Sequence, residues 1–95
     1  MTSKQRAYLR SMANTMETIL YVGIGGVTAA TVHEASLALE ARELIKGCVN
    51  QGCPLTAREA SAELCAQLGA EPIQCIGRRF VIYRASEKDP RIVLE

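Results

Sequence analysis

The chain has 95 residues, the size of one domain, and 48% of them are hydrophobic, an ordinary share for a globular protein. No apolar run approaches the roughly 18 residues of a membrane-spanning helix. The polar N-terminus lacks the apolar segment of a secretory signal. We therefore expect a single cytoplasmic domain over residues 1–95 that does not contact a membrane.

The formal net charge is only +1, but it is unevenly distributed along the chain. Residues 1–16 and 77–84 each carry a charge of +3 and no acid, whereas residues 28–71 carry a net charge of −3. A fold that brings the two basic segments to one side has a basic face, and such a face attracts phosphate backbones. The alternative is that these cations merely solvate the surface.

The four cysteines, at positions 48, 53, 65 and 75, include no CxxC pair, and the single histidine, His33, is separate from them. Zinc sites prefer paired short spacings, so we expect no metal. Nothing else in the chain indicates secretion, which favours free thiols in a reducing cytoplasm. Cys65 and Cys75 lie within apolar patterns and are expected to be small core residues.

The first half of the chain predicts two helices with a strand between them. Residues 2–14 begin with Thr2 and Gln5 at the spacing of a capping box. Residues 18–22 are β-branched and aromatic, which is typical of a strand. A helix is expected from residue 28 to about 41, with Thr28 as its N-cap.

The second half predicts three strands and one helix. Residues 43–49 are expected to form a strand, and Thr56 with Glu59 begins a helix that ends near Gly69. Two further strands, at residues 73–76 and 79–84, are joined by Gly77-Arg78, which suits a type II′ turn. In the charged tail, residues 85–95, the segment 92–94 is expected to dock on the body or add an edge strand.

These elements predict a compact α/β domain in the order α-β-α-β-α-β-β. The two β-α-β crossovers imply parallel strand pairs, with both crossover helices on one face of the sheet. The final hairpin adds an antiparallel strand. We therefore expect a four-stranded mixed sheet packed with helices.

The segment Gly23-Ile24-Gly25-Gly26 joins the first strand to the helix that begins at Thr28. A helix N-terminus presents unpaired N–H groups and the positive end of the helix dipole, which suits an anion such as phosphate. The GxxG spacing is also that of the loop with which K-homology domains clamp a nucleic-acid backbone. Because GxxG is common, the alternative interpretation is a tight strand-to-helix turn.

Four stretches together resemble the YhbY-like family, also called the CRM domain (chloroplast RNA splicing and ribosome maturation). They are Lys4-Gln5-Arg6-x-x-Leu9-Arg10, Val22-Gly23-x-x-Gly26-Val27-Thr28, Ala38-Leu39-Glu40-Ala41-Arg42-Glu43-Leu44-Ile45-Lys46, and Gln74-x-Ile76-Gly77-Arg78-x-x-Val81-Ile82-Tyr83-Arg84. They span nearly the whole chain in the family's order. The resemblance implies a fold similar to the C-terminal domain of translation initiation factor three.

The same resemblance implies an RNA-binding protein associated with the precursor of the large ribosomal subunit. Its partner would be ribosomal RNA rather than DNA, and it would act as a monomer without a cofactor. Relatives commonly carry a lysine or a polar residue at position 24, so Ile24 leaves this loop with backbone N–H groups only. The implied RNA-binding residues are Gly23, Ile24, Gly25, Gly26, Thr28, Lys4, Arg6, Arg10, Lys46, Arg78 and Arg79.

Two other functions are weighed against RNA binding. A protein-interaction module on the same fold is favoured by Ile24 at a loop tip and by the acidic middle helices. An enzyme is the weakest alternative, because the chain has one histidine, no metal constellation and no phosphate-loop lysine. Cys48 and Cys53 have no evident activating partner in the sequence.

Overall fold

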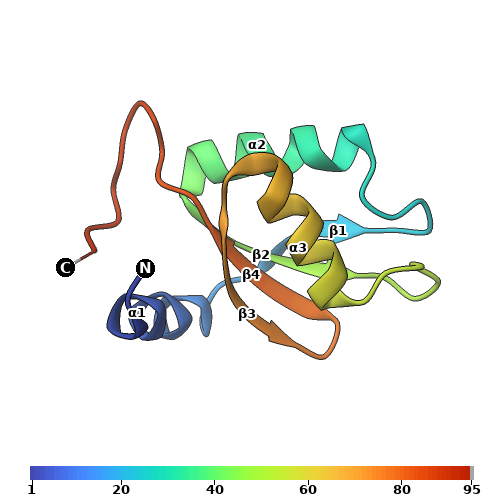
Figure 1. Ribbon diagram of the computed structural model, residues 1–95, viewed down its shortest axis with the longest axis horizontal. Helices are drawn as coiled ribbons and strands as arrows, with labels where there is room; N and C mark the ends of the chain where they lie inside the picture. The colour runs from blue at the N-terminus through green and yellow to red at the C-terminus, as the bar shows by residue number, and fades with distance from the viewer. Residues whose placement is uncertain (95) are drawn as a thin grey trace.

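The computed structural model describes residues 1–94 and contains three helices and four strands in the predicted order (Figure 1). A sheet separates two helical layers: α2 and α3 pack on one face, and α1 packs on the other. The elements are α1 (Ser3–Ala13), β1 (Thr18–Val22), α2 (Ala29–Arg42), β2 (Leu44–Val49), α3 (Ala57–Leu68), β3 (Glu71–Ile76) and β4 (Arg79–Tyr83).

Each helix begins at a threonine that forms a capping box. Thr2, Thr28 and Thr56 each accept a hydrogen bond from the backbone N–H three residues further on. These bonds satisfy N–H groups that have no partner inside the helix. All three helix starts therefore agree with the sequence prediction. The predicted end of α3 is confirmed as well, since Gly69 adopts a left-handed φ of 66°.

The sheet has the order β1-β2-β4-β3. β1 and β2 are parallel neighbours, and β4 is antiparallel to both β2 and β3. The expectation of a second parallel pair is therefore wrong: β2 and β3 run in the same direction, but β4 lies between them. β4 pairs its backbone on both edges, and its residues 80–83 are all buried, as expected of a central strand whose N–H and C=O groups need partners on both sides.

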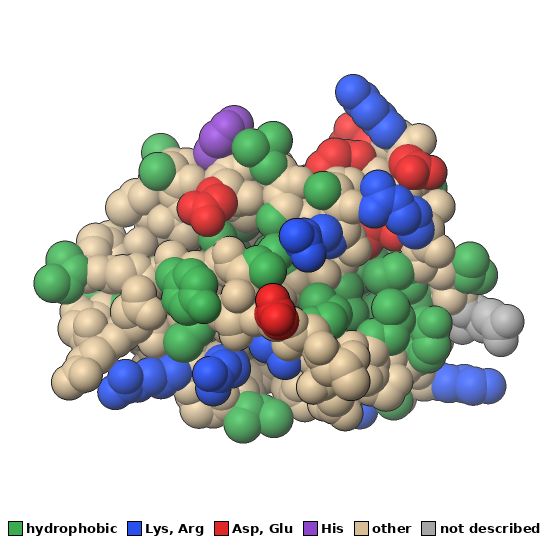
Figure 2. Space-filling view, turned by 180° about the vertical axis from the view of Figure 1, so that it is seen from behind, with side chains coloured by type: hydrophobic (Ala, Val, Ile, Leu, Met, Phe, Trp, Pro, Cys, Tyr) green, Lys and Arg blue, Asp and Glu red, His purple; other side chains and the backbone are tan. Residues whose placement is uncertain are grey.

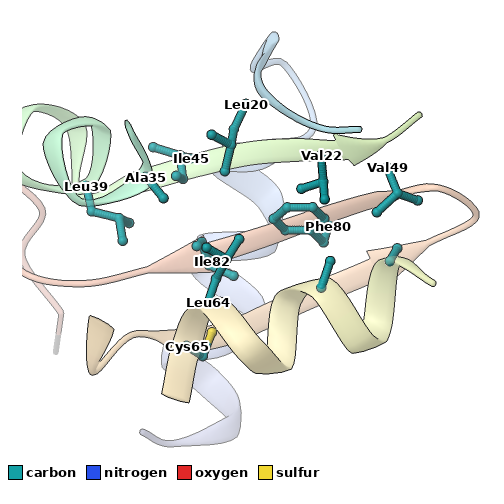
Figure 3. Close-up of a cluster of buried hydrophobic side chains, with 12 residues drawn as sticks. Leu20, Val22, Ala35, Leu39, Ile45, Val49, Leu64, Cys65, Phe80 and Ile82 are labelled. Carbon is teal, nitrogen blue, oxygen red and sulfur yellow. The ribbon is translucent and has the colours of Figure 1, made fainter. Parts of the chain in front are cut away.

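Alternation along β4 divides the core into two clusters. Phe80 and Ile82 point to the side of α2 and α3, where they join Leu39 and Leu64 (Figure 3). Val81 and Tyr83 point to the side of α1. Cys65 is buried in the first cluster and Cys75 packs against it, as predicted.

The segment after β4 forms no strand within the described residues and docks on the body instead. Glu43, predicted as a strand residue, is the C-cap of α2, with a positive φ of 67°. The residue is 1% exposed, and its carboxylate accepts hydrogen bonds from the backbone N–H groups of Ser86, Arg91 and Ile92, at 2.8, 2.7 and 2.8 Å. The predicted docking of residues 92–94 is confirmed, since Ile92 and Leu94 pack on the α1 side of the core.

Candidate nucleic-acid interface

Three connections meet at one end of the sheet: the β1–α2 loop, the β2–α3 loop and the β3–β4 turn. The Asn50 N–H donates to the Val22 carbonyl at 2.8 Å, and the Val49 N–H donates to the Arg78 carbonyl at 2.8 Å. These bonds tie the middle connection to its two neighbours. The two helix-leading loops lie at the right of Figure 1, away from both chain ends. We call this region the loop end.

The segment Gly23-Ile24-Gly25-Gly26, called the glycine loop below, forms a tight turn within the loop end. The Gly26 N–H donates to the Gly23 carbonyl at 3.0 Å, and Gly26 has a φ of 69° beside Pro54 and Leu55. Gly26 is therefore required by its backbone conformation. Gly23 has no positive φ, and a Cβ placed on it would meet nothing within 4 Å. Its missing side chain leaves backbone open to a ligand.

Thr28 and Ile24 have different roles in this loop. The Thr28 hydroxyl accepts the Thr31 N–H at 3.2 Å, and the Thr28 N–H donates to the Thr31 hydroxyl at 3.3 Å. Thr28 therefore fixes where α2 begins. Ile24 is 81% exposed and its side chain lies beside Gly52 in the next loop. It adds an apolar tip and no charge.

Arg78 lies at the rim of a hollow of about 270 Å³ between the β2–α3 loop and the β3–β4 turn. Gly77 has a φ of 59° and Arg78 has no positive φ, which are the signs that a type II′ turn requires. The turn therefore presents Arg78 next to the start of α3. Arg58, on the first turn of α3, is also exposed.

A second basic group lies on the sheet face where α1 packs. Lys46 and Arg79 line a hollow of about 190 Å³ together with Asn14 at the end of α1. Arg10 is four residues before Asn14 and so lies on the same side of the helix. The end of α1 and the final hairpin therefore share one side, as the expected basic face requires. Seen from behind, Lys and Arg side chains gather along the lower edge of the molecule (Figure 2).

Two predicted residues lie elsewhere. Arg6 forms an ion pair of 3.6 Å with Glu71 and donates to the Pro72 carbonyl, at the start of β3. Lys4 lies beside Val93 and Leu94 near the chain ends. Neither is at the loop end. Unlike Arg6, the other predicted cations make no ion pair within residues 1–94. They are Lys4, Arg10, Lys46, Arg78 and Arg79.

Arg84 belongs to the second basic segment, residues 77–84, but its guanidinium bonds to the protein's own backbone. Its guanidinium donates to the Leu68 carbonyl at 3.2 Å and to the Ser36 carbonyl at 3.1 Å. It thereby joins the end of α3 to the middle of α2. Its charge is directed inward and does not belong to the basic face.

Two exposed residues were not predicted as site residues: Arg58 on α3 and Tyr21 on β1. Arg58 follows the N-cap Thr56 by two positions. A cation near a helix N-terminus interacts unfavourably with the helix dipole, so its presence there points to a role other than helix stability. Tyr21 lies between the buried Leu20 and Val22, so alternation places it on the opposite face, which is the face of α1. These two spacings are the signals that could have found them.

The described residues also include four cysteines, one of which is buried. Burial raises the pKa of the Cys65 thiol to about 11, so this thiol stays neutral. All four cysteines are free, and no group of three potential metal ligands occurs within residues 1–94. In the same residues, no helix has the length and apolar character needed to span a membrane.

The fold and this site define a class: a small α/β domain with a glycine loop between its first strand and a capped helix, and with unpaired cations on the final hairpin. The family model described as the CRS1 / YhbY (CRM) domain matches residues 1–84. The chain belongs to this family, which confirms the resemblance found in its sequence.

Known proteins are similar to the chain over almost its full length. It is 36% identical over 94 residues to the probable RNA-binding protein YqeI of Bacillus subtilis, covering 99% of this chain and 98% of that one. It is 30% identical over 88 residues to the probable RNA-binding protein PA4753 of Pseudomonas aeruginosa, covering 93% and 85%. The solution structure of the hypothetical protein SAV1595 from Staphylococcus aureus matches with a TM-score of 0.75 and 35% identity, covering 100% and 99%.

Proposed function

We propose that this protein binds ribosomal RNA in the precursor of the large ribosomal subunit and assists ribosome assembly, as a monomer in the cytoplasm and without catalysis. The observation that carries the proposal is the loop end, where an open glycine backbone and the start of α2 share one end of the sheet with Arg78, which has no ion pair within the described residues. The names of two relatives as probable RNA-binding proteins support it.

The binding mechanism follows from these groups. Gly23 and Gly25 let an RNA backbone approach the loop, and the N-terminus of α2 attracts a phosphate. Arg78 and Arg79 present planar donors that match phosphate oxygens. Most of the affinity would come from these phosphate contacts, which carry little sequence information. Recognition would therefore depend on RNA shape and on unpaired segments.

Association with the assembling subunit is tested by sedimentation of cell extracts through a density gradient. The tagged wild-type protein should sediment with precursors of the large subunit, and the double variant Arg78→Ala/Arg79→Ala should shift to the free fraction. The matched control is Arg42→Ala/Lys88→Ala, which removes two exposed cations from the C-terminal end of α2 and from the tail. Co-sedimentation of the Arg78/Arg79 variant at the wild-type level would contradict the proposal.

A protein partner remains the alternative function, and one observation favours it. Ile24 is 81% exposed at the tip of the loop end, and an exposed large apolar side chain is a common anchor in protein interfaces. This alternative predicts that Ile24→Asp releases the partner and that the arginine substitutions have little effect. A pull-down treated with nuclease separates the two functions: an RNA-mediated partner is lost, whereas a direct protein partner stays bound.

A further inference from the structure

One row of side chains crosses the sheet on the face where α1 packs. Strand register places Tyr21 beside Cys48, Cys48 beside Arg79, and Arg79 beside Ile76. α1 covers the other half of this face. The row itself is open to solvent, since Tyr21 is 56% exposed and Ile76 is 66% exposed. The row therefore offers an aromatic and an aliphatic surface on either side of a guanidinium.

The Tyr21 side chain is oriented along its own strand. Its hydroxyl oxygen lies 3.5 Å from the Thr18 carbonyl oxygen, three residues back. The ring thus extends along β1 while more than half of the residue stays accessible. An aromatic ring that is held by the sheet and open to solvent can accept a flat ligand at little cost in side-chain entropy.

The charges around this row favour a nucleic acid. Arg79 is in the row, Lys46 is in the next row beside Val81, and Arg10 lies on the last turn of α1. None of the three cations forms an ion pair within the described residues. No acidic residue lines the hollow that Lys46 and Arg79 share with Asn14. Aromatic rings combined with free cations are the arrangement by which proteins bind single-stranded nucleic acid.

We propose that Tyr21 is a stacking platform for an unpaired RNA base, whose neighbouring phosphates contact Arg79 and Lys46. This inference rests on the proposed RNA-binding function and names its substrate class, single-stranded RNA. A base inside a duplex is already stacked on both faces and cannot reach the ring. The open row thus extends the loop end into a second subsite on the sheet.

The test measures the affinity of the full chain for a single-stranded RNA oligonucleotide and for a duplex of equal length. Tyr21→Val keeps a strand-forming residue but removes the aromatic face, and it should weaken single-strand binding by about 5- to 150-fold, the effect of one lost stacking contact. Tyr21→Phe should bind as the wild type does. Tyr8→Val is the matched control, since Tyr8 is 50% exposed but lies beside Val93 near the chain ends.

The dependence of affinity on salt distinguishes stacking from a loss of charge. Tyr21→Val should leave the slope of affinity against salt unchanged, because no phosphate contact is removed, whereas Arg79→Ala should reduce it. A second readout is available because the chain has no tryptophan. The indole of Tyr21→Trp should lose fluorescence when the single strand binds and not when the duplex is added.

Two results would overturn the inference, and they differ in what else they affect. If Tyr21→Val binds the single strand as tightly as the wild type, with the wild-type slope, the stacking platform is refuted and the RNA-binding function stands. If the wild-type protein binds neither RNA, both the platform and the proposed function fail. Circular dichroism of each variant establishes that it is folded, as expected for a substitution at an exposed strand position.

Discussion

At the scale of single residues, the glycines have separable roles. Gly47 pairs with Phe80 across β2 and β4, and three ring carbons of Phe80 lie closer than 3.0 Å to the position that a Cβ on Gly47 would occupy. The largest fully buried side chain therefore fills the space above this glycine. Gly23, by contrast, faces open space in the glycine loop. One glycine serves packing, and the other leaves the backbone accessible.

Gly47→Ala is expected to destabilise the protein by roughly 1–3 kcal/mol, because overpacking forces the Phe80 ring out of its position. Chemical unfolding followed by circular dichroism measures this change. The double variant Gly47→Ala/Phe80→Leu should lose less than the sum of the two single changes, since the smaller side chain relieves the clash. Additive losses would show that the ring and the glycine are not coupled.

Gly23→Ala is expected to leave the free energy of unfolding nearly unchanged and to weaken RNA binding by about tenfold, the effect of losing one hydrogen bond to a charged group. The added methyl group meets no protein atom but occupies the space into which a phosphate would come. Parallel unfolding and filter-binding measurements separate the two effects. Undiminished binding by a folded Gly23→Ala protein would argue against close approach at this loop.

At the scale of elements, two carboxylates at the end of α2 hold the C-terminal segment. The Ser86 hydroxyl and the N–H groups of Glu87 and Lys88 donate to Glu40, and these bonds lower the pKa of Glu40. Burial alone would raise the pKa of Glu43, but three backbone N–H donors and Arg91 lower it overall. Both groups are therefore ionised when they hold the segment.

Because the folded-state pKa of Glu43 is lowered, its contribution to stability is present above the unfolded value, about 4.3, and is lost as the pH falls through the folded value. Glu43→Gln should cost about 1–3 kcal/mol at neutral pH and should flatten the decline of the melting temperature below pH 5. Thermal melts across pH 3–7 test this, with amide exchange at Ser86 and Ile92 as a local readout. An unchanged pH profile in the variant would refute the clamp.

Local chemistry made most of these elements predictable, and long-range contacts decided the rest. The capping threonines, Gly69 and Gly77 act through neighbours within four residues, so the sequence alone located helix starts and the hairpin turn. The central place of β4 depends on pairing with β2, which no local pattern encodes. Glu43 was expected in a strand because the distant tail that bonds to its carboxylate, and its positive φ, could not be anticipated from neighbouring residues.

At the scale of the whole molecule, the fold gives different surroundings to cations that are close together in the sequence. Arg6 and Arg10 are four residues apart, yet Arg6 pairs with Glu71 whereas Arg10 makes no ion pair within the described residues. Arg78, Arg79 and Arg84 follow one another closely, but Arg84 turns into the protein. The basic face thus consists of the free cations near the hairpin and the end of α1. The sequence predicted its residue types, and only the tertiary structure could select its members.

The measurement that tests this account most directly is RNA affinity across a salt series. The wild-type protein should lose affinity steeply as salt rises, since each phosphate contact contributes a slope of about −0.7 on single strands. Arg78→Ala/Arg79→Ala should reduce the magnitude of the slope by about 1 to 2, whereas Arg42→Ala/Lys88→Ala should not change it. Equal slopes for the wild type and both double variants would contradict the assignment of the basic face to RNA.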